Sequence, residues 1–220
     1  MPINKQLAVV VLLVAAVVGF FFWNQSKTDN DLIKVMDVPS FEMTNQYGER
    51  FTERDMLGKV YLVEFFFTSC PTICPVMKQN LRLIEDSIND PRFGIVSITI
   101  DPKRDTPERL LEHYKQIQAK SPNWYLLTEN RDYIQEVSKK FNIYLGDAKD
   151  EAKSLDHSGQ FALVDKEGKI RSRLNPHGIP KLYYSGLNYT DAAGVNPSLN
   201  GTYHPDVEMV IEDIKLLLEE

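Results

Sequence analysis

The first hydrophobic pattern in the chain is an uncharged run, Leu7 to Trp23, with the sequence LAVVVLLVAAVVGFFFW. As a helix that rises about 1.5 Å per residue it would reach roughly 26 Å, close to the thickness of the hydrocarbon core of a membrane. The run ends in bulky aromatic residues and not in the small residues of a signal-peptide cleavage site. We therefore expect an uncleaved, membrane-spanning anchor over residues 1–26.

The charges that flank this run favour an amino terminus on the inner side of the membrane, since Lys5 precedes the run and Lys27 follows it among acidic neighbours. The sequence then predicts a single-pass protein of the inner (cytoplasmic) membrane, with its globular part on the extracytoplasmic, periplasmic side. In such an oxidising compartment a pair of thiols can form a disulfide unless something keeps it reduced.

Beyond the run, short apolar segments alternate with helix-like patterns, which predicts one globular domain over residues 27–220. Hairpins and buried strands are expected at 41–52, 59–67, 92–100, 124–127 and 160–174. Helices are expected from Pro75 to Ile88, from Pro107 onward with Thr106 as its cap, at 130–141 and after Pro205. This order predicts an α/β protein, a three-layer sandwich with a mixed central sheet.

One stretch, residues 175–203, does not fit a compact domain. It is rich in Gly, Pro, Asn and Tyr and is longer than most connections between elements. The stretch and its borders hold aromatic and imidazole side chains: His177, Tyr183, Tyr184, Tyr189, Tyr203 and His204. It could carry a surface for a partner or a lid, or it could be a surface insertion without a role.

Composition narrows the class of protein. The chain has 220 residues and 43% hydrophobic content, which is enough for one sizeable core. Its formal net charge is −6 and its pI is near 5.3. A nucleic-acid-binding protein needs a basic face to neutralise phosphates, and no basic cluster longer than two residues occurs in the sequence. We therefore expect no nucleic acid among its partners.

The two cysteines of the chain, Cys70 and Cys74, lie in the segment FFFTSCPTICPVM, between a predicted strand and a predicted helix. The partial positive charge of a helix amino terminus favours thiolate, the form that attacks disulfides and binds metals. Three intervening residues allow a disulfide, although redox pairs are usually separated by two. As metal ligands, two thiolates are too few for a stable site, so a third ligand would be needed.

Four histidines are available as a third ligand. His113 lies in the charged helix ERLLEHYKQ and is predicted to be a solvated side chain. His177 and His204 belong to the long loop, where surface positions are common. His157 immediately precedes an apolar strand, so it lies at a sheet end, where it could meet the cysteine loop.

If Cys70, Cys74 and His157 converge, two thiolates and one imidazole suit Cu(I) in a three-coordinate site, or Cu(II) with a further oxygen or nitrogen ligand. Zinc with an open water position is the chemical competitor. Met77 is a possible soft outer contact, but its helical position favours the core.

Three segments, FFFTSCPTICPVM, TIDPKRDTPERL and LDHSGQFALVDKEGKIR, closely resemble the Sco/SenC family of membrane-anchored copper chaperones. The similarity covers roughly Val38 to Arg171 and the final helix, and it implies a thioredoxin-like fold behind a single amino-terminal helix. By this resemblance, Cys70, Cys74 and His157 occupy the copper-ligand positions of the family.

The resemblance also assigns two acidic residues. Asp101 and Asp105, in the segment DPKRDTP, would lie behind the copper ligands or on the surface that a partner contacts. Each also has a purely local interpretation. Asp101 would end a strand before a proline turn, and Asp105 would help to cap the helix that begins at Pro107.

The function that the resemblance implies is to receive a copper ion from a donor and deliver it to the CuA centre in subunit II of cytochrome c oxidase. The alternative is a thiol–disulfide oxidoreductase that uses Cys70 and Cys74 to reduce the cysteines of the apo-acceptor. The segment LDHSGQFAL lacks the proline that thioredoxins place before the corresponding strand, and its absence favours metal binding over general disulfide exchange.

Overall fold

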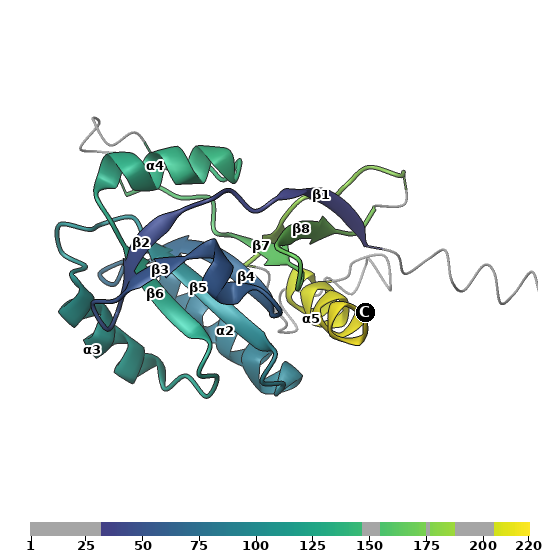
Figure 1. The fold of residues 1–220 in the computed structure, drawn as a ribbon, viewed down its shortest axis with the longest axis horizontal. Coiled ribbons are helices and arrows are strands. Elements are labelled where there is room, and N and C mark those ends of the chain that lie inside the picture. Colours follow the sequence, from purple (N-terminus) through teal and green to yellow (C-terminus); the bar gives the residue numbers. More distant parts are fainter. Residues whose placement is uncertain (1–31, 147–154, 175–176, 188–204) are drawn as a thin grey trace, which may run out of the picture.

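The structure, a computed structural model, describes residues 32–146, 155–174, 177–187 and 205–220 (Figure 1). The anchor predicted over residues 1–26 and most of the stretch 175–203 lie outside the described residues. Among the helices of the described part, none is long and apolar enough to cross a membrane.

Within the described residues, nine strands form one sheet in the order β1-β8-β7-β4-β5-β6-β2-β3, with β9 paired to β7. The strands are β1 (Ile33–Asp37), β2 (Glu42–Asn45), β3 (Arg50–Thr52), β4 (Val60–Phe66), β5 (Phe93–Thr99), β6 (Trp124–Thr128), β7 (Gln160–Val164), β8 (Lys169–Ser172) and β9 (Tyr184–Ser185). The helices are η1 (Glu53–Met56), α2 (Ile73–Ile88), α3 (Pro107–Ile117), α4 (Arg131–Lys140) and α5 (Asp206–Glu219).

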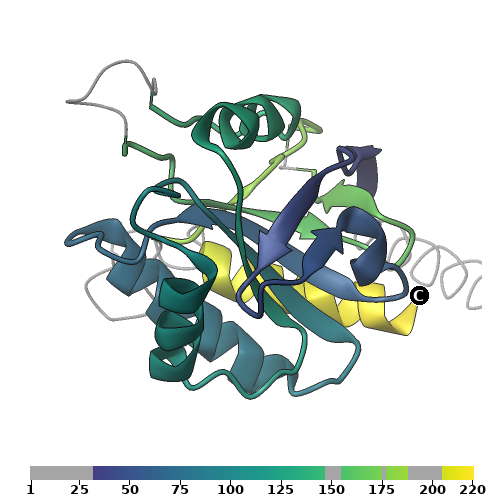
Figure 2. The ribbon, with the colours of Figure 1, turned by 60° about the vertical axis from the view of Figure 1, so that its left-hand side comes forward.

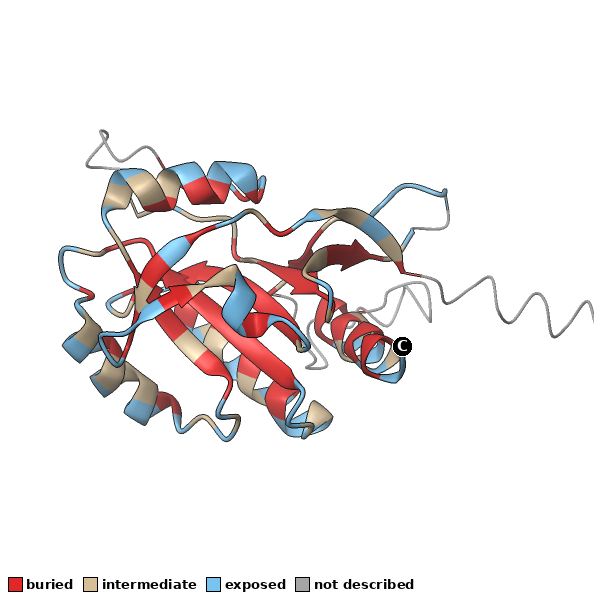
Figure 3. Cartoon of the chain, viewed as in Figure 1, coloured by how far each residue is buried: buried red, intermediate tan, exposed pale blue. Residues whose placement is uncertain are grey.

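The centre of the sheet is parallel, with β4 paired to β5 and β5 to β6. Every residue of β4 and β5 is buried, as Figure 3 shows for the middle of the molecule. Right-handed crossovers put α2 and α3 on one face of these strands, where α5 packs beside α2, and α4 covers the other face (Figure 2). The predicted three-layer sandwich with a mixed sheet is confirmed.

The direction of β7 fixes where the site forms. β7 runs antiparallel to β4, with Val63 opposite Ala162 and Tyr61 opposite Val164. The start of β7 therefore lies at the same sheet edge as the end of β4. The loop that carries the cysteines follows β4, and His157 precedes β7, so the topology brings them to one edge.

Helix α2 begins at Ile73, two residues before the predicted start at Pro75. The prediction was wrong because proline is tolerated through the whole first turn, where backbone N–H groups have no partner inside the helix. The earlier start places Cys74 inside the helix. The cap of α3 is as predicted, since Thr106 accepts a hydrogen bond from the Arg109 backbone N–H and Pro107 is the first helical residue.

In the described part of the stretch 175–203, residues 177–180 are exposed, whereas the segment that follows them packs into the core. Tyr183 and Tyr184 are buried, and β9 pairs with the start of β7. A side chain at Gly186 would place its Cβ 2.5 Å from Phe161, so only glycine lets the backbone come this close. The hydroxyl of Tyr184 donates a hydrogen bond to Asp213 on α5.

Candidate metal centre

The cysteine loop turns tightly between β4 and α2, so both sulfurs lie together at the start of the helix. The backbone N–H of Cys74 donates a hydrogen bond to Cys70 Sγ at 3.4 Å. The Thr72 hydroxyl lies 3.7 Å from the same sulfur. Both cysteines are free thiols and each is 9% exposed. The pair is therefore close to the surface but screened from most of the solvent.

His157 completes the group from the other strand. Its Nε2 lies 3.4 Å from Cys74 Sγ, and its ring packs edge-on against Phe67 with centroids 6.1 Å apart. An isolated bridge between His157 and Leu145 fixes its backbone. One ligand atom from each of Cys70, Cys74 and His157 lies within 4.8 Å of the other two. The three side chains predicted from the sequence thus converge.

The two thiols differ in acidity. Burial works against ionisation of Cys70, but hydrogen bonds from Cys74 and Thr72 outweigh it and lower the pKa of the Cys70 thiol. Burial raises the pKa of the Cys74 thiol strongly, and the neighbouring Cys70 and Glu64 add to the increase. Cys70 is therefore the more acidic thiol of the pair.

The imidazole of His157 is kept neutral. Burial lowers its pKa to about 4, and nearby Asp156 offsets only part of this effect. Neutral imidazole is the form that binds metals. Because Nε2 faces the sulfurs, the buried Nδ1 points away from them, and it has no hydrogen-bond partner among the described residues.

Asp105 supports the cysteine loop from behind. Its carboxylate is fully buried and accepts hydrogen bonds from the backbone N–H and hydroxyl of Thr68 and from the hydroxyl of Thr99. The cap of α3 is Thr106, so the local interpretation of Asp105 as a helix cap is wrong. Asp105 instead ties the loop after β4 to the end of β5.

Asp101 has a different environment. Its side chain pairs with Arg104 at 2.9 Å, and its backbone carbonyl accepts hydrogen bonds from the N–H groups of Arg104 and Asp105. These are contacts within the turn that follows β5. These contacts match the local interpretation of Asp101. Its contact with a partner stays a prediction.

His113 is not the solvated side chain that was predicted. It stacks on Phe66 with ring centroids 5.8 Å apart, and burial lowers its pKa to about 4, with help from Lys78. It lies one helical turn from each of the buried residues Leu110 and Ile117, a spacing that could have revealed its inward position. Met77 is fully buried, as its helical position indicated.

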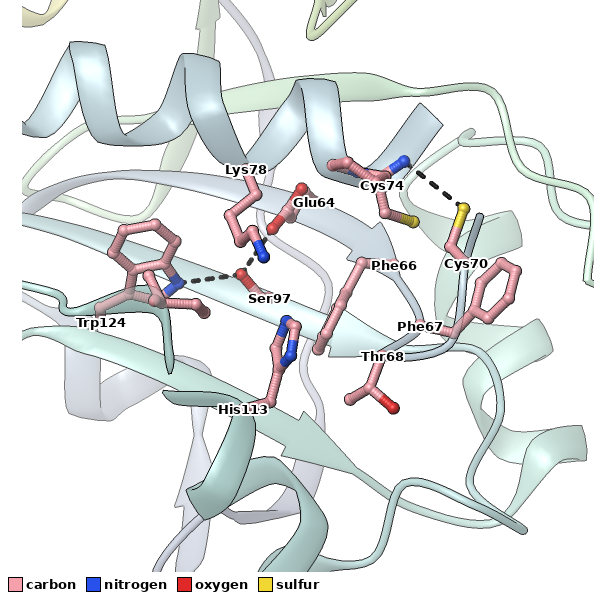
Figure 4. A pocket seen from close by; sticks show the side chains of 12 residues that line it. Glu64, Phe66, Phe67, Thr68, Cys70, Cys74, Lys78, Ser97, His113 and Trp124 are labelled. Atoms are coloured by element: carbon pink, nitrogen blue, oxygen red, sulfur yellow. Dashed lines mark hydrogen bonds between the residues drawn. The ribbon is translucent and has the colours of Figure 1, made fainter. Parts of the chain in front are cut away.

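Figure 4 shows a cavity below the cysteines, with Glu64, Lys78 and His113 in its wall. Glu64 is 5% exposed and accepts a hydrogen bond from Ser97 at 2.7 Å. The sequence signal for this residue is plain, because it is the one charge within an otherwise apolar central strand. Its position beside the cysteines could not be predicted from that signal alone.

The fold and the site together define the class of protein. A mixed sheet, a cysteine pair where a central strand gives way to a helix, and a histidine before the next antiparallel strand describe a thioredoxin-like protein with a candidate Cys-Cys-His metal site. The chain belongs to the SCO1/SenC family, whose family model matches residues 34–188. The resemblance drawn from the sequence is thereby confirmed.

Individual relatives agree with this assignment. A SCO2-like protein of Rickettsia conorii is 37% identical over 147 residues, which cover 64% of this chain and 70% of the relative. A SCO1/SenC family lipoprotein from Bacillus anthracis has a crystal structure with a TM-score of 0.67 and 29% identity, covering 86% of this chain and 98% of that one.

Two further solved structures share the fold. Yeast Sco1, solved with copper bound, has a TM-score of 0.54 and 28% identity, and covers 67% of this chain and 84% of that one. BsSco, a member of the Sco family of cytochrome c oxidase assembly proteins, has a TM-score of 0.60 and 24% identity, and covers 86% of this chain and 96% of that one.

Proposed function

We propose that this chain binds copper through Cys70, Cys74 and His157 and delivers the ion to the CuA centre in subunit II of cytochrome c oxidase. The observation that carries the proposal is the convergence of the three ligand atoms within 4.8 Å. Two sulfurs and one imidazole are the soft ligand set that Cu(I) prefers. The solved copper-bound form of yeast Sco1, a similar protein, supports copper over zinc.

The environment of the ligands suits an ion that is cargo. His157 is neutral and can bind a metal without losing a proton, and the lowered pKa of the Cys70 thiol favours the thiolate that a metal needs. Pro71 and Thr72 beside them are exposed, which leaves a side open to a donor or an acceptor. A three-coordinate ion has room for an incoming ligand before an original one leaves.

An anaerobic Cu(I) titration of the reduced full-length protein tests the binding step. We expect one ion per chain. His157→Ala and Cys70→Ser should each weaken binding by more than about 100-fold, beyond the range for losing a merely supporting residue. His177→Ala, which removes an exposed histidine, is the matched control and should bind as the wild type does. Unchanged affinity in His157→Ala would exclude the three-ligand site.

The unequal acidity of the two thiols supports a second candidate, a thiol–disulfide oxidoreductase that reduces the cysteines of the apo-acceptor. An acidic, attacking Cys70 beside a protonated Cys74 is the arrangement that such exchange uses. This function would survive His157→Ala and be abolished by Cys70→Ser. Reduction of an oxidised acceptor peptide by His157→Ala and by Cys70→Ser distinguishes the two candidate functions. A reductase needs only the two cysteines, whereas copper delivery requires all three side chains.

The membrane anchor over residues 1–26 is part of the same proposal. It would hold the globular domain on the periplasmic side of the inner membrane, within reach of an oxidase subunit and a copper donor. Carbonate extraction of membranes that contain the full chain tests the anchor, and protease treatment of intact spheroplasts tests the orientation. Release by carbonate, or protection of the domain in spheroplasts, would contradict it.

A further inference from the structure

Of the three candidate ligands, His157 alone comes from outside the cysteine loop, so its ring must be held in one orientation to meet the sulfurs. A metal-binding histidine is usually oriented by a hydrogen bond from its second ring nitrogen to an oxygen. In His157 the second nitrogen, Nδ1, is buried and has no such partner among the described residues. Within the described part of the chain, packing therefore sets the plane of this imidazole.

The side chain of Phe67 makes an aromatic contact with this imidazole. The two rings meet edge to face, with centroids 6.1 Å apart and an interplanar angle of 78°. Aromatic rings attract each other in this arrangement, and the attraction depends on their orientation as well as on buried area. Phe67 is 8% exposed, so its ring is itself held by the surrounding protein and gives the imidazole a fixed neighbour.

The backbone on both sides of this contact is fixed as well. The carbonyl of Phe67 accepts a hydrogen bond from the Cys70 N–H at 3.3 Å, which ties Phe67 to the cysteine loop. The isolated bridge holds His157 opposite the buried Leu145, whose side chain lies on the same face of the two-stranded ribbon. The freedom that remains is rotation of the imidazole about its side-chain bonds, and the Phe67 ring restricts this rotation.

Phe66 allows a direct comparison at the same strand end. Neighbouring residues of an extended chain point to opposite sides, and Figure 4 shows the rings of Phe66 and Phe67 directed apart. The Phe66 ring stacks on His113, which is not one of the three converging ligands. Each phenylalanine therefore contacts one histidine, but only Phe67 contacts a candidate metal ligand.

We propose that Phe67 is a positioning residue of the metal site. Its edge-to-face contact holds the imidazole of His157 in the plane in which Nε2 faces the two sulfurs, in place of a hydrogen bond at Nδ1. The proposal rests on the proposed function, because it specifies what makes His157 available as the third ligand. Loss of the Phe67 ring should therefore lower copper affinity only through His157.

Anaerobic Cu(I) titration of the reduced full-length protein tests the proposal with matched variants. Phe67→Leu removes the ring beside His157 and should weaken binding by about 10-fold or more, the range for a residue that orients a ligand. Phe66→Leu makes the same change beside His113 and should bind as the wild type does. Phe67→Tyr keeps the ring and should also retain wild-type affinity. Equal affinity of Phe67→Leu and the wild type would overturn the proposal.

A double-mutant cycle separates positioning from a general loosening of the cysteine loop. In a His157→Ala background, Phe67→Leu should cause no further loss of copper affinity, because the ring then has no imidazole to hold. An equal loss in both backgrounds would mean that Phe67 supports the loop as a whole, and it would refute a role through His157.

NMR of the metal-free protein with isotope-labelled histidine gives a measurement that does not depend on copper. The imidazole signals of His157 should be sharp in the wild type and in Phe66→Leu. In Phe67→Leu they should show exchange broadening, because the ring then adopts more than one orientation. Sharp His157 signals in Phe67→Leu would contradict the proposal. If that variant does not fold, Phe67→Ile replaces it with the same expectations. A wild type that binds no copper would contradict the proposed function, and the NMR comparison would still decide the role of Phe67.

Discussion

At the scale of single residues, the burial of Glu64 should make the stability of the folded chain depend on pH. Its folded-state pKa of about 7 exceeds the ordinary value of 4.5 because of burial, so the folded chain binds more protons than the unfolded chain between these values. The stability of the wild type should therefore fall as the pH rises from 4.5 to 7. Glu64→Gln should remove this fall, which amounts to roughly 2–3 kcal/mol.

Urea denaturation of both proteins across that window measures the effect. As the pH rises, the free energy of unfolding of Glu64→Gln should increase relative to that of the wild type. A constant difference between the two proteins would mean that Glu64 has the same pKa in the folded and the unfolded chain.

The burial of His113 should make stability depend on pH in the opposite direction. Its folded-state pKa of about 4 lies below the ordinary 6.5, because of burial and the nearby Lys78, so the unfolded chain binds the extra proton. Stability should be lost as the pH falls from 6.5 towards 4. His113→Phe keeps an aromatic ring against Phe66 and should reduce this loss by about 1 kcal/mol, allowing for partial solvent screening. Thermal unfolding of the wild type and of His113→Phe at pH 6.5 and near pH 4 tests this prediction. An equal loss of stability in the two proteins would contradict it.

The residues of the site differ in how far the sequence reveals them. Cys70 and Cys74 lie between a predicted strand and a predicted helix, and His157 immediately precedes an apolar strand. All three were therefore predictable as candidate metal ligands. The inward position of His113 was missed, although its spacing from Leu110 and Ile117 indicated it, because the charged residues around it suggested a solvated face of the helix. Glu64 was visible as a charge in a strand, but its neighbours across the sheet depend on strand pairing.

At the scale of elements, Asp105 joins the end of β5 to the loop after β4. Asp105→Ala would leave two hydroxyls and the Thr68 backbone N–H without their buried acceptor, so we expect a loss of about 3 kcal/mol of stability. Asp101→Ala removes a bond to the exposed Arg104 and should cost less than about 1 kcal/mol.

Chemical denaturation compares the two aspartate variants directly. Copper affinity provides a second measurement, since a loosened cysteine loop should bind the ion less tightly in Asp105→Ala only. Equal stability of the two variants would show that Asp105 does not hold the loop.

The order and type of the elements followed from the hydrophobic pattern, whereas their exact ends did not. Pro75 appeared to mark the start of α2, yet the helix begins at Ile73 because the whole first turn tolerates proline. The pairing of β9 with β7 was missed because a strand of two residues leaves no periodic signal. Short elements of this kind are defined by the surfaces they pack against.

At the scale of the whole molecule, Arg171 joins the two ends of the described domain. Its guanidinium lies 2.8 Å from Asp165, 2.9 Å from Glu220 and 2.8 Å from the Leu32 carbonyl. Arg171→Ala would leave Asp165 buried without its cation, so we expect a loss of about 3–5 kcal/mol. Lys34→Ala, which removes an exposed pair with Glu167, should cost less than about 1 kcal/mol.

Thermal unfolding of the two variants decides this point. A melting temperature in Arg171→Ala as high as in Lys34→Ala would mean that the ends of the domain are held by packing alone. Limited proteolysis adds a local measurement, because weaker attachment of α5 should expose the carboxyl terminus to carboxypeptidase.

The overall architecture was predictable because strands and helices alternate with few interruptions. Sequence pattern alone could not show that β7 would pair with β4 and bring His157 to the cysteines. That pairing depends on which strand completes the sheet, and it is decided by contacts between distant parts of the chain.

The separation of 83 residues between Cys74 and His157 has a consequence for how the protein is made. At about 5–20 residues per second, roughly 4 to 17 seconds pass between synthesis of the second cysteine and synthesis of the histidine. During that interval the nascent chain carries a bare dithiol that cannot yet form a three-ligand site. Under the proposed function, loading with metal would therefore be a maturation step that follows synthesis of the whole domain.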